Sequence, residues 1–197
     1  MKRSLLVALF VGVFALSMTL TADQQPAAAP AATRPIEVQK LKDNLYVLTT
    51  STLGDAATFS GGNVAVFITD AGVTLVDTKL VAWGPALLTA VKTVTSKPVT
   101  TIINTHTHGD HTGNDDKFGA AVEIVAQENT KANMAKMDAF KGEKAQFLPK
   151  KTFTDKMTVG TGKDRIDLYY FGAGHTNGDA FIVFPALRVL HTGDMFA

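Results

Sequence analysis

Seven consecutive residues, Thr105-His-Thr-His-Gly-Asp-His111, constrain this chain more than any other segment. They contain three of its five histidines and one carboxylate. Neutral imidazole and carboxylate groups are typical ligands of zinc, and also of iron or manganese. The string directly follows residues 99–104, a run rich in β-branched residues that predicts a buried strand. The sequence therefore indicates a metal site on the loop that leaves a strand, where a rigid sheet can hold a site open.

The spacing within the string divides its ligands into two sets. Side chains at positions i and i+2 of an extended segment point the same way, so His106 and His108 can bind one ion from the same side. Gly109 lets the backbone turn sharply, after which Asp110 and His111 can face a second position. The alternative is a solvated polar loop whose histidines are incidental.

The two remaining histidines lie in similar surroundings. His175 lies in a glycine-rich turn between two apolar, strand-like runs, and His191 ends another such run just before Gly193-Asp194. A single histidine in such a position is more often structural than a ligand. The joint pattern of five histidines at strand ends beside glycines is harder to explain without a metal.

In this order, the motifs resemble those of the metallo-β-lactamase superfamily of metallohydrolases. Its signature is a His-x-His-x-Asp-His string, a Gly-x-x-His-Thr-x-Gly turn and a Gly-Asp at a strand end. Residues 72–77 match a further, earlier strand that ends in Asp. The first motif is highly specific, and the others are specific in this order. The resemblance covers about residues 36–197 and implies an α/β fold, an αββα four-layer sandwich with its metals at one edge of the sheets.

The resemblance also assigns roles to single residues. It implies six metal ligands: His106, His108 and His175 for a first ion, Asp110 and His111 for a second, and Asp194 bridging both. Asp77 would order the loop that carries the ligands, although an ordinary turn aspartate is an equal alternative. His191 has no ligand counterpart, and we expect it to be a supporting or structural residue.

The implied activity is hydrolysis of a small molecule. One or two zinc ions, with iron or manganese as alternatives, would lower the pKa of bound water from about 15.7 to about 7. The metal-bound hydroxide would then cleave an ester, thioester, lactone, lactam or phosphodiester. Asp110 would orient that hydroxide or accept its proton, and the sequence has no Gly-x-Ser-x-Gly elbow for a serine nucleophile.

Three alternatives stay open. Some members of the superfamily are mononuclear iron dioxygenases. Others are true β-lactamases, which usually carry Cys or Ser at or near the position of Asp194. The last is an inactive, truncated metal-binding domain, because the chain ends three residues after Asp194 whereas family members continue to one more metal-binding histidine. We therefore expect residues 36–197 to be an incomplete domain.

The N-terminal residues predict export. Met1-Lys-Arg and the apolar run over residues 5–20 have the layout of a secretory signal peptide, taken as residues 1–22, with Ala31 as an alternative cleavage site. A retained membrane anchor is the alternative. Residues 23–35, rich in Ala and Pro, predict a linker. We expect a periplasmic or secreted protein that contacts the membrane only through an uncleaved signal segment.

Composition narrows the remaining choices. The chain has no cysteine, so neither a disulfide nor a thiolate ligand is available, and its stability must come from the packed core and bound metal. Its formal net charge of +1 gives no sign of nucleic-acid binding. Nothing in the sequence defines an oligomeric state.

Apolar periodicity predicts the secondary structure. Strand pairs are expected over residues 36–41 with 44–49 and 63–69 with 72–77, single strands over 99–104 and 122–126, and helices over 84–95 and 128–140. A hairpin is expected within 150–164, turning at 160–162, before three last strand-like runs.

Overall fold

The computed structural model describes residues 36–49 and 58–196 of the 197-residue chain. The predicted signal peptide and linker, residues 1–35, lie outside the described residues and stay predictions. Of the helices that the structure describes, none is long and apolar enough to cross a membrane.

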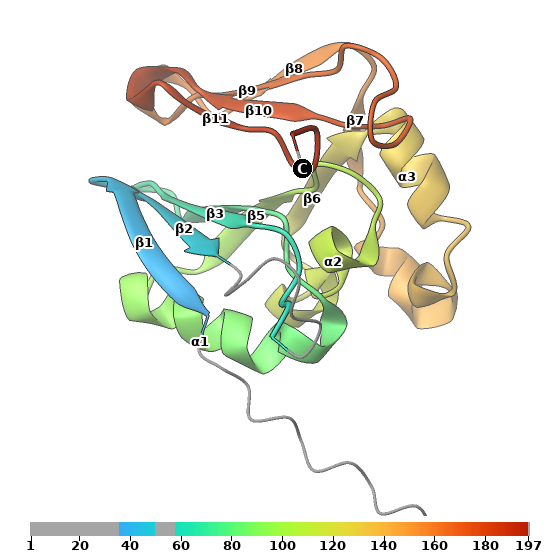
Figure 1. Ribbon diagram of the computed structural model, residues 1–197, viewed down its shortest axis with the longest axis horizontal. Coiled ribbons are helices and arrows are strands. Elements are labelled where there is room, and N and C mark those ends of the chain that lie inside the picture. The colour runs from blue at the N-terminus through green and yellow to red at the C-terminus, as the bar shows by residue number, and fades with distance from the viewer. Residues whose placement is uncertain (1–35, 50–57, 197) are drawn as a thin grey trace, which may run out of the picture. The chain divides into compact units, whose positions relative to one another are not determined.

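Strands of the described residues form two sheets that lie face to face (Figure 1). The seven strands of the larger sheet lie in sequence order: β1 (Glu37–Lys42), β2 (Leu45–Thr49), β3 (Val64–Ile68), β4 (Val73–Val76), β5 (Val99–Ile103), β6 (Glu123–Gln127) and β7 (Lys151–Phe153). The smaller sheet has the order β11 (Val189–His191), β10 (Phe181–Phe184), β9 (Ile166–Tyr169) and β8 (Lys156–Val159). The α-helices are α1 (Gly84–Val94), α2 (Gly109–Thr112) and α3 (Glu128–Met134).

Strand direction determines where a site can form. Strands β1 to β4 are antiparallel, whereas β4, β5, β6 and β7 run parallel to one another. Parallel neighbours end at the same edge of a sheet, and ligands of open α/β sheets bind at that carboxyl edge. The segments that follow β4 and β5 therefore meet there, and one of them is the histidine-rich string.

Alternating side chains in the larger sheet build two cores. In β3, Val64 and Val66 pack toward α1, whereas Phe67 packs toward the smaller sheet, because successive side chains of a strand point to opposite faces. The helix contributes a buried stripe at helical spacing, formed by Leu87, Ala90 and Val91. The larger sheet is thus buried on both faces.

The predicted mixed α/β sandwich is confirmed. Figure 1 shows α1 under the larger sheet and the smaller sheet above it, and no described helix lies over the outer face of the smaller sheet. On and beside that face, the side chains of Phe171 and Leu190 are exposed. The described residues supply a helix layer and both sheets of the αββα arrangement.

One predicted hairpin is wrong. Residues 150–164 do not form a single unit, because β7 pairs in parallel with β6 while β8 pairs with β9 in the other sheet. Phe153 is buried between the sheets, so the chain passes from one sheet to the other directly after it. The glycine turn joins β8 to β9, with positive φ at Gly160 and Gly162.

The predicted helix over residues 128–140 is too long. Helix α3 ends at Met134. The Ala135 amide still bonds to a carbonyl four residues back, but those of Lys136 and Met137 bond to carbonyls three residues back. Met137 then adopts an extended backbone, and its sulfur accepts a hydrogen bond from Thr107 Oγ1 at 3.5 Å. Contact with the histidine-rich loop thus replaces the last helical turn.

Candidate metal centre

The histidine-rich string leaves β5 at the carboxyl edge of the larger sheet. Its first half is extended, and its second half forms the single helical turn α2, for which His108 is the N-cap residue. The turn is closed by hydrogen bonds from the amides of His111 and Thr112 to the carbonyl of His108. This local geometry turns the string back on itself, so that both halves face the same space.

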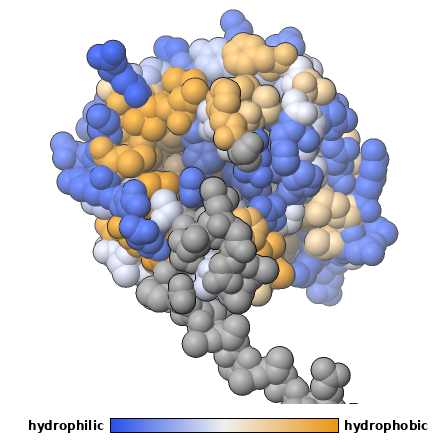
Figure 2. All heavy atoms as spheres, in the orientation of Figure 1, coloured by the Kyte–Doolittle hydropathy of each residue, from blue (hydrophilic) through white to orange (hydrophobic). Residues whose placement is uncertain are grey.

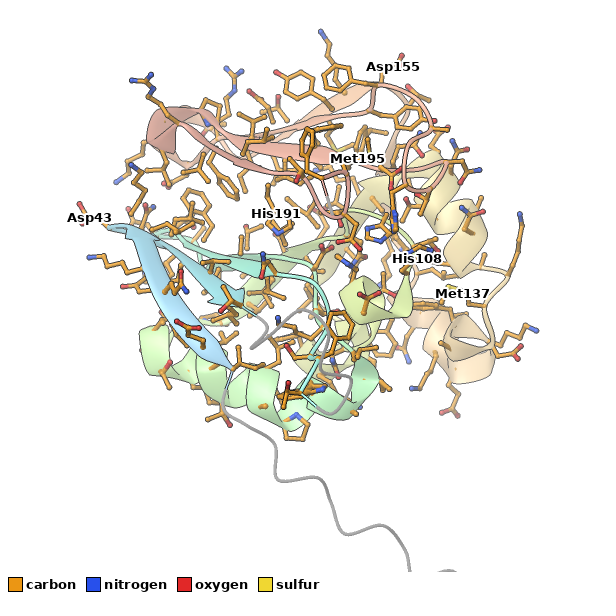
Figure 3. The ribbon with its side chains drawn as sticks, in the orientation of Figure 1. Asp43, His108, Met137, Asp155, His191 and Met195 are labelled. Atoms are coloured by element: carbon orange, nitrogen blue, oxygen red, sulfur yellow. The ribbon has the colours of Figure 1, made fainter. Side chains whose placement is uncertain are left out.

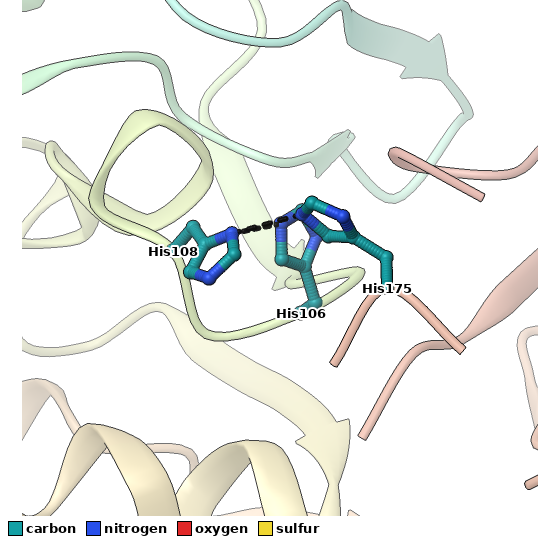
Figure 4. Close-up of side chains that lie close together, drawn as sticks. All are labelled: His106, His108 and His175. Carbon is teal, nitrogen blue, oxygen red and sulfur yellow. Dashed lines mark hydrogen bonds between the residues drawn. The ribbon is translucent and has the colours of Figure 1, made fainter. Parts of the chain in front are cut away.

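Three imidazoles converge at the first position (Figure 4). His106 Nε2 lies 3.2 Å from His108 Nδ1, and His175 Nε2 lies 3.0 Å from the same atom. In a tetrahedral zinc site with Zn–N distances of about 2.0–2.1 Å, ligand nitrogens lie roughly 3.3 Å apart. The nitrogens of these three rings therefore have the spacing of a metal-ligand set.

A second group of donors lies beside the first. His111 Nε2 is 3.5 Å from Asp110 Oδ2 and 3.3 Å from Asp194 Oδ1, while the other oxygen of Asp194 is 3.6 Å from His175 Nε2. The Asp194 carboxylate thus lies between the two groups, as a bridging ligand must. His111 Nε2 is buried and makes no hydrogen bond within the described residues, which fits an atom whose partner is a metal ion.

Asp77 orients two of these rings from behind. Its Oδ2 accepts hydrogen bonds from His111 Nδ1 and from Thr105 Oγ1, both at 2.7 Å. Thr105 Oγ1 in turn lies 3.0 Å from His106 Nδ1 and can only accept there, because its proton is donated to Asp77. This network leaves Nε2 of both His106 and His111 facing the site.

The charge states of the two rings differ. Burial, together with the nearby charge of His111, lowers the pKa of His106 to about 4, so this ring is neutral at neutral pH, as a metal ligand must be. Burial also opposes a charge on His111, but the attraction and hydrogen bond of Asp77 outweigh it and raise the pKa of His111 to about 9. A metal at His111 would therefore displace a proton, so its affinity falls as the pH falls.

The turn that carries His175 is held from several sides. Asp179 accepts from the amide and hydroxyl of Thr176, at 2.7 and 2.8 Å. The Gly178 carbonyl accepts from Thr130 in α3 at 2.7 Å, and the Ala180 amide donates to the carbonyl of Thr105 at 2.8 Å. The last bond joins the smaller sheet directly to the histidine-rich loop.

His191 supports the turn that carries Asp194. It lies between the two sheets (Figure 3), where its Nε2 is 3.1 Å from the carbonyl of Asn63 and its Nδ1 accepts from the amide of Gly193 at 3.2 Å. Both nitrogens are thus engaged by backbone groups. This is the supporting role expected from the sequence, and the ring is not free to bind a metal.

Three residues that shape the site were not predicted from the sequence: Gly61, Gly62 and Thr105. Gly61 and Gly62 lie in close contact with the histidine-rich string. An added Cβ at Gly62 would lie 2.1 Å from His111 Cε1, and one at Gly61 would lie 2.4 Å from the Asp110 carbonyl oxygen. The glycine pair before a predicted strand was the available signal. Thr105 was missed as well, although its position between the strand and the first histidine marked it.

The site opens into a cleft of about 500 Å³ between the ends of the two sheets. Its lining includes three of the expected ligands, Asp110, His111 and Asp194, and otherwise consists largely of apolar side chains and glycines. A volume of this size is typical of sites for small molecules, which span about 300–1,000 Å³.

Comparison with known proteins points to one family. The model of the family described as the Metallo-beta-lactamase superfamily matches residues 57–197. Among curated proteins, the chain is 29% identical over 166 residues to a metallo-beta-lactamase type 2 from Elizabethkingia meningoseptica, covering 82% of this chain and 62% of that protein. It is 32% identical over 136 residues to the alpha subunit of a 2,4-dinitroanisole O-demethylase from a Nocardioides species, covering 64% and 38%.

A solved structure shares the fold. A metallo-beta-lactamase from Pontibacter korlensis has a TM-score of 0.64 at 26% identity, with 79% of this chain and 69% of that chain covered. The chain spans less than two thirds of the length of either curated relative.

Proposed function

This chain belongs to the metallo-beta-lactamase superfamily, and on that premise we propose that it is a metal-dependent hydrolase of small-molecule substrates. The observation that carries the proposal is the convergence of His106, His108 and His175 on one point, with Asp194 between them and His111. Histidine side chains with a purely structural role are not expected to place three ring nitrogens at the spacing of metal ligands.

We propose zinc as the metal, with iron or manganese as the alternatives. All donor atoms are nitrogens and oxygens, because the chain contains no cysteine. His106, His108 and His175 would hold the first ion, Asp110 and His111 the second, and Asp194 would bridge them. The buried Nε2 of His111, which makes no hydrogen bond among the described residues, supports a metal ion at the second position.

The residues divide the chemistry among them. The bound ions would supply a water of lowered pKa and would polarise the substrate's carbonyl or phosphoryl oxygen. Asp110, whose Oδ2 faces His111 Nε2, would orient the attacking oxygen or accept its proton. Asp77 and Thr105 would keep the Nδ1 protons of His111 and His106 in place. One bond forms from the water oxygen to the electrophilic atom, one bond to the leaving group breaks, and the leaving group takes up a proton.

A second candidate is β-lactam hydrolysis. It is favoured by the names of the relatives, two of which are metallo-beta-lactamases. Another relative is named for O-demethylation of 2,4-dinitroanisole, so similarity to these proteins does not define the substrate.

We further propose that the protein is exported, on the pattern of residues 1–22.

The test combines metal content with hydrolysis. Purified protein is dialysed and analysed for zinc, iron and manganese, then assayed with a 4-nitrophenyl ester, a chromogenic cephalosporin and bis(4-nitrophenyl) phosphate. We expect zinc and hydrolysis of at least one probe, both lost in His106→Ala with an unchanged circular dichroism spectrum. Thr89→Ala, on α1 away from the site, is the control. Hydrolysis that persists unchanged in His106→Ala would refute the proposal.

A further inference from the structure

The cleft beside the second ligand group has apolar walls. It lies between the β1–β2 hairpin and β11, and Asp110, His111 and Asp194 line one of its parts. Figure 2 shows apolar residues gathered on this side of the molecule. The apolar side chains that face the cleft are Leu41, Leu45, Val47, Phe59, Phe184 and Val189.

Beyond the proposed metal ligands, the walls of this cleft offer a bound anion no cationic side chain among the described residues. Among the described residues that line it, none is lysine or arginine. The titratable group other than the proposed metal ligands is His191, and both of its ring nitrogens are engaged by the backbone of Asn63 and Gly193. A substrate carboxylate or phosphate bound along these walls would lose its hydration without gaining a partner.

From this lining we infer that the substrate is an uncharged carboxylic ester or lactone, and that the cleft binds its apolar acyl group. The inference rests on the proposed hydrolytic function and narrows it. Each methylene that leaves water for such walls improves binding about fourfold. Hydrolysis joins the water oxygen to the acyl carbon, breaks the acyl C–O bond and releases the alcohol with a proton.

Two esters that differ only at the far end of the acyl chain test this. 4-Nitrophenyl hexanoate is neutral, and mono(4-nitrophenyl) adipate has the same leaving group and chain length but ends in a carboxylate. With zinc-loaded protein we expect kcat/KM to be at least tenfold higher for the hexanoate.

A charge placed at the rim should reduce that preference. Leu41 is 44% exposed at the cleft, so Leu41→Lys can present an ammonium group there without being buried. We expect the hexanoate-to-adipate ratio to fall about three- to tenfold in this variant. Thr89→Lys adds the same charge on α1, on the other side of the larger sheet, and should leave the ratio unchanged.

Binding provides a readout that does not depend on turnover. The corresponding amides, N-(4-nitrophenyl)hexanamide and N-(4-nitrophenyl)adipamic acid, are compared by equilibrium dialysis, and we expect the neutral amide to bind at least tenfold more tightly. If esters are hydrolysed but neither assay favours the neutral compound, the inference is overturned and the hydrolase proposal stands. If none of the ester, cephalosporin and phosphodiester probes is hydrolysed but the neutral amide binds preferentially to the wild type and less so to Leu41→Lys, the apolar site stands and the hydrolase proposal fails.

Discussion

At the scale of single residues, the tightest packing in the site is between a glycine backbone and an imidazole ring. The second ligand group has no space behind His111, since any side chain at Gly62 would occupy the volume of that ring. The ring is also fixed at Nδ1 by Asp77. Steric contact on one side and a hydrogen bond on the other thus leave His111 a single position.

We predict that Gly62→Ala weakens the second metal position selectively. The added Cβ, 2.1 Å from His111 Cε1, must displace the ring, which should lower affinity for the second ion at least about tenfold and cost about 1–3 kcal/mol of stability. Zinc titration by calorimetry would show one site retained and one weakened. Gly109→Ala is the matched control, because the turn expected at Gly109 forms without a positive φ there and a Cβ at this position meets nothing within 4 Å. Equal weakening by both substitutions would contradict the argument.

A buried carboxyl beneath the metal loop predicts a pH dependence of stability. Burial raises the pKa of Asp115 to about 8, and hydrogen bonds from Thr78 Oγ1 and Asn104 Nδ2 only partly offset the effect. The unfolded carboxyl has a pKa of about 3.9. Between these values the folded state binds the extra proton, so folding stability falls as the pH rises from about 4 to about 8.

We predict that Asp115→Asn removes this dependence. The amide oxygen can still accept from Thr78 and Asn104, and no ionisation follows. Relative to wild type, the variant should gain on the order of 1–3 kcal/mol between pH 5 and pH 8. Urea unfolding of both metal-free proteins at the two pH values measures the difference, in which titrations common to both cancel. A stability difference that does not change with pH would count against a neutral Asp115.

At the scale of elements, one side chain at the end of β4 organises the loop that follows β5. Asp77 has a positive φ of 66° and is fully buried. Its Oδ1 accepts from the Thr105 amide at 2.8 Å, while Oδ2 accepts from the Thr105 hydroxyl and from His111. Because β4 and β5 are parallel neighbours, this short side chain reaches the adjacent loop.

We predict that Asp77→Asn lowers zinc affinity about 10- to 100-fold. Asparagine tolerates the positive φ, and its oxygen can replace Oδ1. Its NH₂ group, however, would face His111 Nδ1, so that ring would have to carry its proton on Nε2, where the metal binds. Competition with a zinc chelator measures the affinity. Asp43→Asn, in the exposed turn between β1 and β2, makes the same chemical change away from the site and should have no effect.

The sequence predicted those features of the fold and the site that are formed by residues close together in the chain, and not those that join distant segments. Strand β5 and the histidine-rich string are adjacent, so periodicity and ligand type located both. Helix α1 was found from its apolar stripe. The separation of β7 from β8 was not predictable from periodicity, because it depends on Phe153 being buried between two sheets. The contact of Gly62 with His111 was missed because it joins segments far apart in the chain.

At the scale of the whole sandwich, the ligands come from both sheets. His106, His108 and His111 follow β5 of the larger sheet, whereas His175 and Asp194 lie on turns that follow β9 and β11 of the smaller sheet. Between the sheets themselves the inner core is apolar and non-directional. A metal held by both groups of ligands would therefore join the sheets at one edge, as a disulfide does in proteins that contain cysteine.

We predict that metal binding raises the unfolding temperature, and that the effect needs ligands from both sheets. Free zinc at about 1,000 times its dissociation constant stabilises the folded state by about 4 kcal/mol, which for a domain of this size is a rise of roughly 8–16 °C. Differential scanning calorimetry with zinc and with a chelator measures it. His175→Ala removes one ligand of the smaller sheet and should lose most of the rise, whereas Thr89→Ala should keep it. An equal rise in His175→Ala would mean that zinc binds the larger sheet alone, and that the sheets are held together by their apolar core without help from the metal.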